Sequence, residues 1–415
     1  MVLILKRHLP TLLVLGLTFL AGFSVYLLTL APTVTFEDSG ELITAAYHLG
    51  IPHQPGYPLF TLLGRTFSLL PLQNVAYRLN LMSAFLTALG AMFICWAVIL
   101  FIDDNMKGNS RQAVSRTSEF FFKYAPAFGA GMMMISTFEI WEQSLITEVY
   151  GLNNLFVSLF IFILILWHRQ RDLSEKVRYF FIASYLSGLA FSNHTTSLMF
   201  LPIMVVFIIL WDRRIILNAG SIAGGLVFFA LGVTPYIYLP VASARNPWMD
   251  WGNPENWTNF IRTVSRHQYG LEGGPSLEEY LPQLVTYGEL ILQQWVISLF
   301  FAGFFLAGFA LYKMFKERNP LFYIFIFFFI LAAPLTTYLT NFDVTVADVF
   351  VASENKALVS VFYIPSYILI AFLAGIGVFK IFQYLNLKTS LMYATAIIFL
   401  LIILVSLFNN YSHLI

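Results

Sequence analysis

Cysteine is almost absent from this chain, since Cys95 is the only one among 415 residues. A single thiol cannot form an intrachain disulfide and cannot supply a cysteine-based metal site. Cys95 lies inside a long apolar run, which favours a plain role as a small buried side chain. Functions that depend on a disulfide framework, a cysteine zinc site or a redox pair of cysteines are therefore excluded.

Charge is also scarce. Only 11% of the residues are charged, whereas 59% are hydrophobic and the mean hydropathy is +0.75. Soluble domains carry roughly 25% charged residues, so a soluble fold of this size is excluded. The formal net charge of +1 identifies no partner, and we expect membrane lipids, not nucleic acid, around the chain. We find no internal repeat, low-complexity tract or glycine-rich phosphate loop.

Long apolar runs are what the sequence has in excess. Because backbone polar groups in lipid must be paired internally, runs of about 20 apolar residues must be helices. The first run follows Lys6 and Arg7, but it is long enough to span and no small-x-small cleavage pattern follows it, so we interpret it as a retained helix. We predict an all-α polytopic membrane protein, a single transmembrane domain over residues 1–415. About eleven spans are expected, approximately Leu12 to Leu30, Leu79 to Ile102, Tyr124 to Phe138, Val149 to Trp167, Tyr179 to Ser192, Thr195 to Leu210, Ile215 to Leu239, Glu289 to Tyr312, Leu321 to Leu339, Val359 to Phe379 and Ser390 to Phe408.

The basic residues predict the orientation, because Lys and Arg near helix ends stay on the cytoplasmic side. With the N-terminus inside, 15 of the 22 acidic residues fall outside and the C-terminus is external. The bacterial cytoplasmic membrane is the expected location, with the endoplasmic reticulum membrane as the alternative. The inside segments would hold 17 of the 23 basic residues, namely Lys6, Arg7, Lys107, Arg111, Arg116, Lys123, Arg169, Arg171, Lys176, Arg178, Arg213, Arg214, Lys313, Lys316, Arg318, Lys380 and Lys388.

Three predicted outside segments carry most of the information about function. They cover residues 31–78, 241–289 and 340–358. These segments are too polar to face lipid and too aromatic to be simple linkers, which predicts amphipathic helices on the membrane surface. We therefore expect the chemistry on the external face, with the first of these segments as the catalytic loop.

Three acids stand together at the start of the first outside segment. On a helix that begins here, Asp38 and Glu41 lie three residues apart and share one face beside Glu37. A plain alternative is open, because an N-cap Asp followed by an acid at N3 stabilises a helix start without any chemistry. A cap does not explain Glu37, so all three are candidate catalytic residues.

The run His53-Gln-Pro-Gly-Tyr-Pro follows in the same segment. Two prolines and a glycine hold its backbone nearly fixed and prevent a continuing helix. The run therefore directs His53 and Tyr57 in set directions, and we place both around a sugar or acceptor. A plain turn on the membrane surface remains the alternative.

Cations are scarce on the predicted outside face, so a site for an anion must draw on few residues. In the second outside segment, Arg266 and Arg245 are candidates for binding a phosphate, although lipid headgroups or loop carboxylates could also occupy them. Trp251 and Tyr269 could stack on a sugar, although interfacial aromatics also anchor loops. The cations left on this face are Arg65, Arg78, Arg245, Arg262, Arg266 and Lys356.

Polar residues also interrupt the apolar runs. Glu148 and Tyr150 stand at the outer end of the fourth predicted helix, and Asn193 with His194 separates the fifth from the sixth. Ionisable groups at such depth are costly and usually functional. We place Glu148 and Tyr150 at the sugar or acceptor and Asn193 and His194 at the donor, with a neutral histidine bonded to a neighbouring helix as the alternative for His194. Two further acids are interpreted as solvated loop residues, Glu139 and Glu142.

This inventory suits a transferase that takes its sugar from a lipid. Nucleotide-activated sugars are not available outside the cytoplasmic membrane, whereas a polyprenyl-phosphate sugar is. Its leaving group is a stable phosphate anion, so the reaction needs one carboxylate base and cations, and no second, protonated carboxyl. We expect no certain cofactor and leave open a divalent metal beside the acids. The rivals are a lipid-sugar transporter or flippase, which would show repeats and midplane charges, and a ligase for lipid-linked glycans.

At these residues the chain resembles the transmembrane protein O-mannosyltransferase family of the GT-C glycosyltransferase superfamily. The first two matching motifs are specific, and the others alone would be weak. They occur in family order across nearly the whole membrane portion: Asp38-Ser-Gly-Glu-Leu, His53-Gln-Pro-Gly-Tyr-Pro-Leu, Thr147-Glu-Val-Tyr, Asn193-His194, Trp251-Gly-Asn-Pro, Arg266-His-Gln-Tyr-Gly and Phe362-Tyr-Ile-Pro-Ser-Tyr.

The resemblance implies a GT-C fold and a catalytic acid in the first external loop, which falls on Asp38. It also implies a polyprenyl- or dolichyl-phosphate sugar donor, inversion at the anomeric carbon, and Ser or Thr of an exported protein as acceptor. Two features depart from the family. Members usually show His-Pro-Pro where this chain has His53-Gln54-Pro55, and many carry a large soluble C-terminal region that this sequence does not show.

Overall fold

Helices account for the regular structure of this protein. The computed structural model describes residues 2–106, 116–269, 275–344, 346, 348–384 and 389–414. Within those residues the only β-type pairing is a single parallel bridge between Ile51 and Asp250. Lys107, Arg111 and Lys388, predicted on the cytoplasmic side, lie outside the described residues.

The elements follow one another along the chain as helices joined by short connections. The α-helices are α1 (Val2–Thr29), α2 (Ser39–His48), α3 (Pro58–Ser68), α4 (Val75–Met106), α5 (Arg116–Ile135), α6 (Phe138–Leu145), α7 (Tyr150–His168), α8 (Leu173–Phe191), α9 (Phe200–Trp211), α10 (Arg214–Leu217), α11 (Ala219–Val233), α12 (Tyr238–Ser243), α13 (Trp257–Val264), α14 (Leu277–Gln293), α15 (Ile297–Lys316), α16 (Leu321–Ile330), α17 (Thr336–Thr340), α18 (Val349–Ser360), α19 (Ile364–Tyr384) and α20 (Thr389–Leu414). Short 3-10 turns are η1 (Thr195–Met199), η2 (Thr234–Ile237), η3 (His267–Tyr269) and η5 (Val361–Tyr363), and η4 (Leu331–Leu335) is a π-helical turn.

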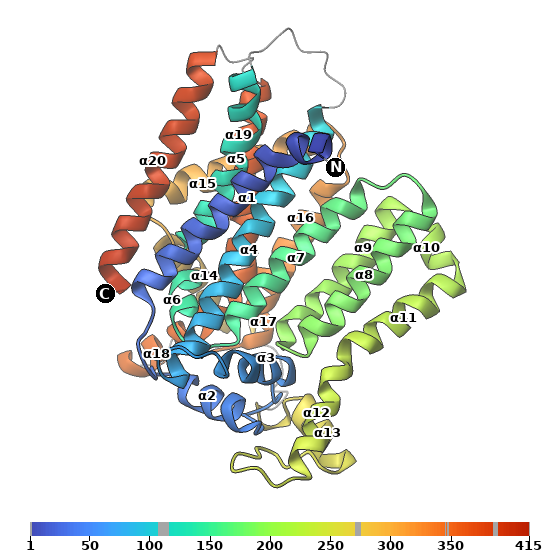
Figure 1. Ribbon diagram of the computed structural model, residues 1–415, viewed down its shortest axis with the longest axis vertical. Helices are drawn as coiled ribbons and strands as arrows, with labels where there is room; N and C mark the ends of the chain where they lie inside the picture. Colours follow the sequence, from blue (N-terminus) through green and yellow to red (C-terminus); the bar gives the residue numbers. More distant parts are fainter. Residues whose placement is uncertain are drawn as a thin grey trace.

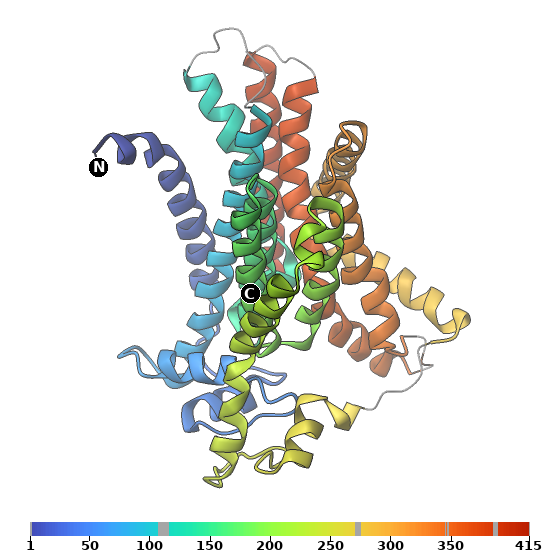
Figure 2. The same cartoon turned by 90° about the vertical axis from the view of Figure 1, so that its right-hand side faces the viewer.

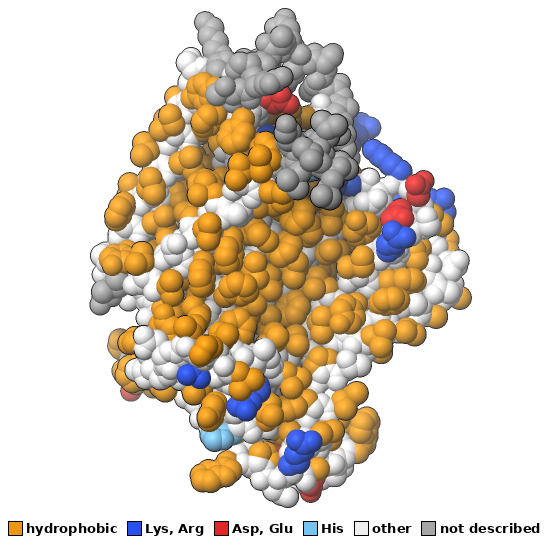
Figure 3. All heavy atoms as spheres, in the orientation of Figure 1, with side chains coloured by type: hydrophobic (Ala, Val, Ile, Leu, Met, Phe, Trp, Pro, Cys, Tyr) orange, Lys and Arg blue, Asp and Glu red, His pale blue; other side chains and the backbone are white. Residues whose placement is uncertain are grey.

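The multi-pass membrane fold is confirmed, whereas the count of eleven spans is not. On the face in Figure 3, hydrophobic side chains cover the broad middle, and charged side chains lie toward the two ends. Thr195–Trp211 is apolar but shorter than a full span. Eight segments of the described residues are long and apolar enough to cross a membrane: His8–Thr29, Val75–Met106, Tyr150–His168, Ala219–Ser243, Ile297–Lys316, Leu321–Thr340, Val349–Tyr384 and Ser390–Leu414.

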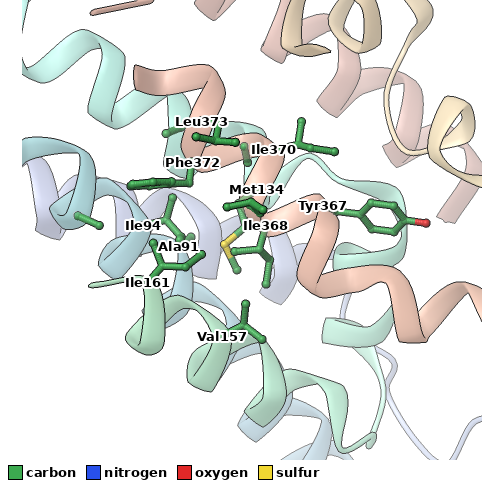
Figure 4. Packing of buried hydrophobic residues seen from close by; sticks show 14 of the residues in the cluster. Ala91, Ile94, Met134, Val157, Ile161, Tyr367, Ile368, Ile370, Phe372 and Leu373 are labelled. Atoms are coloured by element: carbon green, nitrogen blue, oxygen red, sulfur yellow. The ribbon is translucent and has the colours of Figure 1, made fainter. Parts of the chain in front are cut away.

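The core lies where α4, α5, α7 and α19 pack together. Figure 4 shows Ala91 and Ile94 of α4, Met134 of α5, Val157 of α7 and Phe372 of α19 in one cluster of buried side chains. Burial of apolar area alone does not hold helices together in lipid, so close packing of side chains must contribute. This cluster makes the bundle a rigid support for the loops at its ends.

The third predicted span, Tyr124 to Phe138, is wrong at its end. Helix α5 stops at Ile135, and a new helix, α6, begins at Phe138. The buried side chain of Asn410 on α20 donates from Nδ2 to the carbonyl of Ser136 at 2.8 Å and to that of Gln294 at 3.1 Å. A distant asparagine thus satisfies the carbonyls that two interrupted helices leave open, which is why local apolarity did not reveal the break.

Helices α8 and α11 cross at two glycines. A Cβ atom on Gly188 would lie 2.3 Å from the Phe229 carbonyl oxygen, and one on Gly232 would lie 2.3 Å from that of Tyr185. Small residues at such crossings let two backbones approach closely, which strengthens packing in membranes.

We expect Gly188→Val to separate α8 from α11 and to destabilise the protein by about 1–3 kcal/mol, as overpacking does. Thermal unfolding in detergent would measure the loss. Gly308→Val is the matched control, because, apart from the adjacent backbone of its own helix, no atom of the described residues lies within 4 Å of the position that a Cβ would take there. An unchanged melting temperature for Gly188→Val would show that the helices do not depend on this crossing.

The two ends of the bundle differ. Figures 1 and 2 place α2 and α3 beside α12 and α13 at one end, here named the site end, while the N-terminus and α10 lie toward the other. The predicted outside segments supply the site end with α2, α3, α13 and α18. The opposite end carries ion pairs between described basic residues and acids, Lys123–Asp103, Arg169–Asp104, Lys176–Asp212, Arg214–Asp212 and Lys380–Glu317.

Candidate active site

Hydrogen bonds from Asn80 of α4 hold the segment that leads from α1 to the site end. The buried side chain of Asn80 donates to the carbonyls of Ala31 at 2.9 Å and Thr33 at 3.1 Å. Its own oxygen accepts from the hydroxyl of Thr147. Glu37 then adopts a positive φ of 61°, a conformation that non-glycine residues rarely take. These contacts and this backbone conformation fix the positions of Glu37 and Asp38 at the start of α2.

Asp38 is the N-cap residue of α2, but the plain capping alternative does not hold. Its side chain makes no capping hydrogen bond, and Glu41 accepts instead from the backbone N–H of His53 and lies 3.1 Å from His53 Nδ1. Helix α14 shows the contrast, because Ser276 and Glu279 form a complete capping box there. Asp38 and Glu41 are therefore directed toward His53 and not toward the start of α2.

The His53-Gln-Pro-Gly-Tyr run turns inward and is not a plain surface turn. Its backbone closes from Gly56 N–H to the His53 carbonyl at 2.8 Å, and Tyr57 takes a left-handed conformation with a φ of 38° as α3 begins. His53 and Tyr57 are both buried. Nε2 of His53 lies 2.9 Å from the Tyr57 hydroxyl and 3.7 Å from Oδ2 of Asp38. Glu41, His53 and Tyr57 thus form one hydrogen-bonded chain with Asp38 alongside.

Asp38 remains open to solvent on the other side, since its side chain is 54% exposed and that of Glu41 only 19%. Partial burial raises the pKa of Asp38, the nearby His53 opposes this shift, and the charge of Glu41 adds to it. A carboxylate with a raised pKa is a stronger base, and an exposed one can meet a substrate. Glu37 is also exposed and also has a raised pKa, but of these two acids it is Asp38 that lies beside His53, at 3.7 Å from Nε2.

The second predicted outside segment docks onto this loop through backbone pairing. Ile51 N–H donates to the Met249 carbonyl at 2.8 Å, and Trp251 N–H donates to the Ile51 carbonyl at 3.1 Å. The Trp251 indole ring lies 6.4 Å from the His53 ring, edge to face. Trp251 is still about half exposed. It therefore stands at the rim of the site, where a sugar or a peptide could contact it.

Gln54 links the same two segments by a hydrogen bond, a role that the sequence analysis did not predict. Its Oε1 accepts from the backbone N–H of Gln268 at 3.0 Å, and Gln268 Oε1 accepts from the Trp251 indole N–H at 2.8 Å. Nothing in the spacing of Gln54 and Gln268 pointed to this contact. In the sequence Gln54 stood out only as a polar residue between His53 and Pro55.

Arg266 comes from this docked segment and reaches the break between α8 and α9. Its Nη1 donates to the Thr195 hydroxyl at 3.2 Å, and its guanidinium lies 4.4 Å from the centre of the Tyr269 ring. Within the described residues Arg266 has no carboxylate at ion-pair distance. The charge of Arg266 acts to lower the pKa of Tyr57 and that of His194. An arginine without an acidic partner beside a cluster of acids can receive an anionic ligand.

His194 is buried between aromatic rings. Its ring lies parallel to that of Tyr57 at 6.3 Å and 5.3 Å from that of Tyr150. Nδ1 accepts from the backbone N–H of Thr196, so the proton of the neutral ring resides on Nε2. Burial and the Arg266 charge lower the pKa of His194 to about 3. His194 can therefore serve a phosphate only as a neutral hydrogen-bond donor.

The side chains of Glu148 and Asn193 both form hydrogen bonds with the backbone of Val149. Glu148 is buried, and its Oε2 accepts from the Val149 N–H at 3.3 Å. Asn193 Nδ2 donates to the Val149 carbonyl at 3.2 Å. Glu148 Oε1 and Asn193 Oδ1 have no hydrogen-bond partner among the described residues. Two buried oxygen atoms are thus left unsatisfied next to Tyr150.

The interpretation of Glu139 and Glu142 as solvated loop acids is wrong for Glu139. Glu139 is only 4% exposed, and burial raises its pKa to about 8. Its backbone N–H donates to Gln294 Oε1 at 3.0 Å, and its carboxyl oxygen lies 3.4 Å from Nε2 of Gln143. The break at residues 136 and 137 turns α6 back into the bundle, which buries a residue that local polarity placed in a loop.

Arg245 stands apart from this cluster. It follows α12 at its C-terminal end and is exposed. The remaining predicted residues gather around Tyr57, whose pKa is raised by burial, lowered by Arg266 and raised by Tyr269, Glu148 and Asp38. Tyr57 is therefore the point at which the first segment, the α7 start and the second segment converge.

One set of three residues has side-chain atoms of the types that bind metal ions. Asp38, Glu41 and His53 place one ligand-type atom each within 4.8 Å of one another. Both ring nitrogens of His53 are already engaged, with Glu41 and with Tyr57. We therefore describe the trio as a hydrogen-bonded chain and assign no metal ion to it.

Comparison with known proteins finds one matching family model and relatives from two organisms. Residues 38–216 match a family model described as the protein O-mannosyl-transferase TMEM260 N-terminal domain. The mouse protein O-mannosyl-transferase TMEM260 is 31% identical over 262 residues, which cover 61% of this chain and 34% of the mouse protein. The Dictyostelium discoideum protein O-mannosyl-transferase tmem260 is 29% identical over 283 residues, which cover 64% of this chain and 32% of that protein. The chain spans about one third of the length of these relatives. Both relatives are eukaryotic and give no support to a bacterial membrane.

Proposed function

We propose that this protein transfers mannose from a polyprenyl- or dolichyl-phosphate sugar to Ser or Thr hydroxyls of a protein, because residues 38–216 match the model of the protein O-mannosyl-transferase TMEM260 N-terminal domain. The observation that carries the proposal is the convergence at Tyr57 of a half-exposed carboxylate, Asp38, and an arginine, Arg266, that has no carboxylate partner among the described residues. Base and phosphate ligand are the two groups that such a transfer requires.

In the proposed reaction Asp38 accepts the proton of the acceptor hydroxyl. The hydroxyl oxygen forms a bond to the anomeric carbon, while the bond from that carbon to the phosphate oxygen breaks. The electron pair of the broken bond leaves with the lipid phosphate, and attack from the opposite face inverts the carbon. Glu41 keeps His53 in place, and its negative charge raises the pKa of Asp38, which makes Asp38 a stronger base. Glu37 lies next to Asp38 in the chain, and the charge of Asp38 raises the pKa of Glu37.

Arg266 holds the departing phosphate in this scheme, and the neutral His194 donates a hydrogen bond from Nε2. Tyr150 and Asn193 line the same side, and Trp251 and Tyr269 contact the sugar or the acceptor at the rim. The site end faces away from the cytoplasm, because the basic residues gather at the opposite end. An exported protein can then reach Asp38 while the lipid donor approaches from the membrane.

The direct test supplies purified full-length protein in detergent with dolichyl-phosphate [3H]mannose and a Ser/Thr-rich peptide. We expect labelled mannose on the peptide and free dolichyl phosphate. Transfer to a lipid-linked glycan instead would favour a ligase, and donor binding without any product would favour a transporter. Transfer is expected to persist in EDTA, because both nitrogens of His53 are engaged within the protein.

A further inference from the structure

We infer that Glu148 serves as a hydrogen-bond donor, presenting a protonated Oε1 to a hydroxyl oxygen of the donor sugar. This inference rests on the proposed function. It gives a specific role to an acid that the transfer scheme above leaves unused, since neither the base nor the phosphate ligand requires it.

The geometry of the carboxyl group supports this role. Its Oε2 accepts from the Val149 N–H at 3.3 Å, and the backbone of Asp38 also donates to the group. Oε1 is buried and has no partner in the described part of the chain. Buried polar atoms almost always have a partner, so one without any requires an explanation. A ligand that reaches Oε1 provides it.

The charges around Glu148 favour its neutral form. The groups that face it are Asp38 and Glu37 from the segment before α2, Tyr57 at the start of α3, and Tyr150 at the start of α7. None of them is a cation. Burial raises the pKa of Glu148 well above its ordinary value, and the charges of Asp38 and Glu37 raise it further. A protonated carboxyl group carries one O–H donor.

Asn193 supplies the second half of the argument. Its Oδ1 is also buried without a partner among the described residues, and its Nδ2 is bound to the carbonyl of Val149, the residue that follows Glu148. A sugar hydroxyl both donates and accepts hydrogen bonds. One hydroxyl could therefore donate to Asn193 Oδ1 while it accepts from Glu148 Oε1. A phosphate oxygen could satisfy Glu148 but not Asn193, because it has no proton to donate.

The test compares Glu148→Gln with Glu148→Leu. Glutamine has nearly the same shape and always offers an N–H donor, so we expect kcat/KM for dolichyl-phosphate mannose to stay within about threefold of wild type. Leucine has no donor, and we expect a loss of about 10- to 100-fold, the usual effect of removing one positioned hydrogen bond. Equal losses in both variants would overturn the inference, because they would show that the negative charge is what matters.

Two further measurements separate this role from a structural one. First, the wild-type rate should fall at high pH as Glu148 loses its proton, and the Glu148→Gln enzyme should lack that decline. Second, binding of the donor, followed as an increase in melting temperature, should rank the variants in the same order. If the wild-type protein binds the donor but transfers nothing, the proposed function fails, and this ranking still decides the role of Glu148. A decline at high pH that persists in Glu148→Gln would contradict the inference.

Discussion

Asp38→Asn is expected to reduce mannose transfer by about 10²- to 10⁴-fold, the range that a general base contributes. Asparagine has the same shape as aspartate but cannot accept the hydroxyl proton. Because the Asp38 side chain makes no capping hydrogen bond and is 54% exposed, the substitution should leave the melting temperature near that of wild type. Initial rates with dolichyl-phosphate [3H]mannose and a peptide acceptor measure the effect.

Glu255→Gln is the control for this experiment, because it removes an exposed acid from the same end of the molecule. Its rate should match that of wild type. Full activity of Asp38→Asn would remove Asp38 as the base. A loss confined to Glu41→Gln would transfer the role to Glu41, although Glu41 is already held by two contacts with His53.

The pH dependence follows from the same residue. Partial burial and the Glu41 charge raise the pKa of Asp38, and a base works only when it is ionised. The rate should therefore rise with pH through the pKa of Asp38. With the decline assigned to Glu148, the full profile is bell-shaped, and each limb disappears in a different variant.

The fold class could be predicted from the sequence because its cause is local. In lipid a long apolar run such as residues 79–102 has no alternative to a helix, and α4 contains all of it. The break after Ile135 could not be predicted, because Asn410 satisfies it from the other end of the chain. The burial of Glu139 followed from that break, which explains why a polar residue in an apparent loop was misplaced.

The candidate site was predictable where chemistry and backbone restriction coincide. Asp38, Glu41 and His53 lie within one segment of the sequence, and the proline-rich turn that brings them together is visible in the sequence. Gln54 and Gln268 were missed because their contact spans two segments whose docking only the structure reveals. The neutral state of His194 was likewise invisible, since it depends on burial and on a distant arginine.

From the sequence, Arg266 was the first candidate for binding the phosphate and Arg245 the second, and the structure distinguishes them. Arg266 donates a hydrogen bond to Thr195, and its charge acts to lower the pKa of Tyr57 and that of His194. Arg245, by contrast, is exposed at the end of α12. The other cations predicted on this face are engaged elsewhere or exposed. Arg65 and Arg78 donate to backbone carbonyls of the first segment, Lys356 pairs with Glu289, and Arg262 is exposed on α13.

Arg266→Gln is therefore expected to lower kcat/KM for the lipid donor by about a hundredfold or more, since it removes the cation that stabilises the departing phosphate. Arg266→Lys should recover part of the loss, because lysine keeps the charge but lacks the planar fork that binds phosphate through two N–H groups. Arg262→Gln, on the same segment, serves as the matched control and should stay within about twofold, the range of a rim charge. Melting temperatures would show whether losing the Thr195 contact unfolds the segment. If Arg245→Gln raised the KM for the donor while Arg266→Gln left it unchanged, the phosphate would bind at the end of α12, and the site would have to be redrawn away from Tyr57.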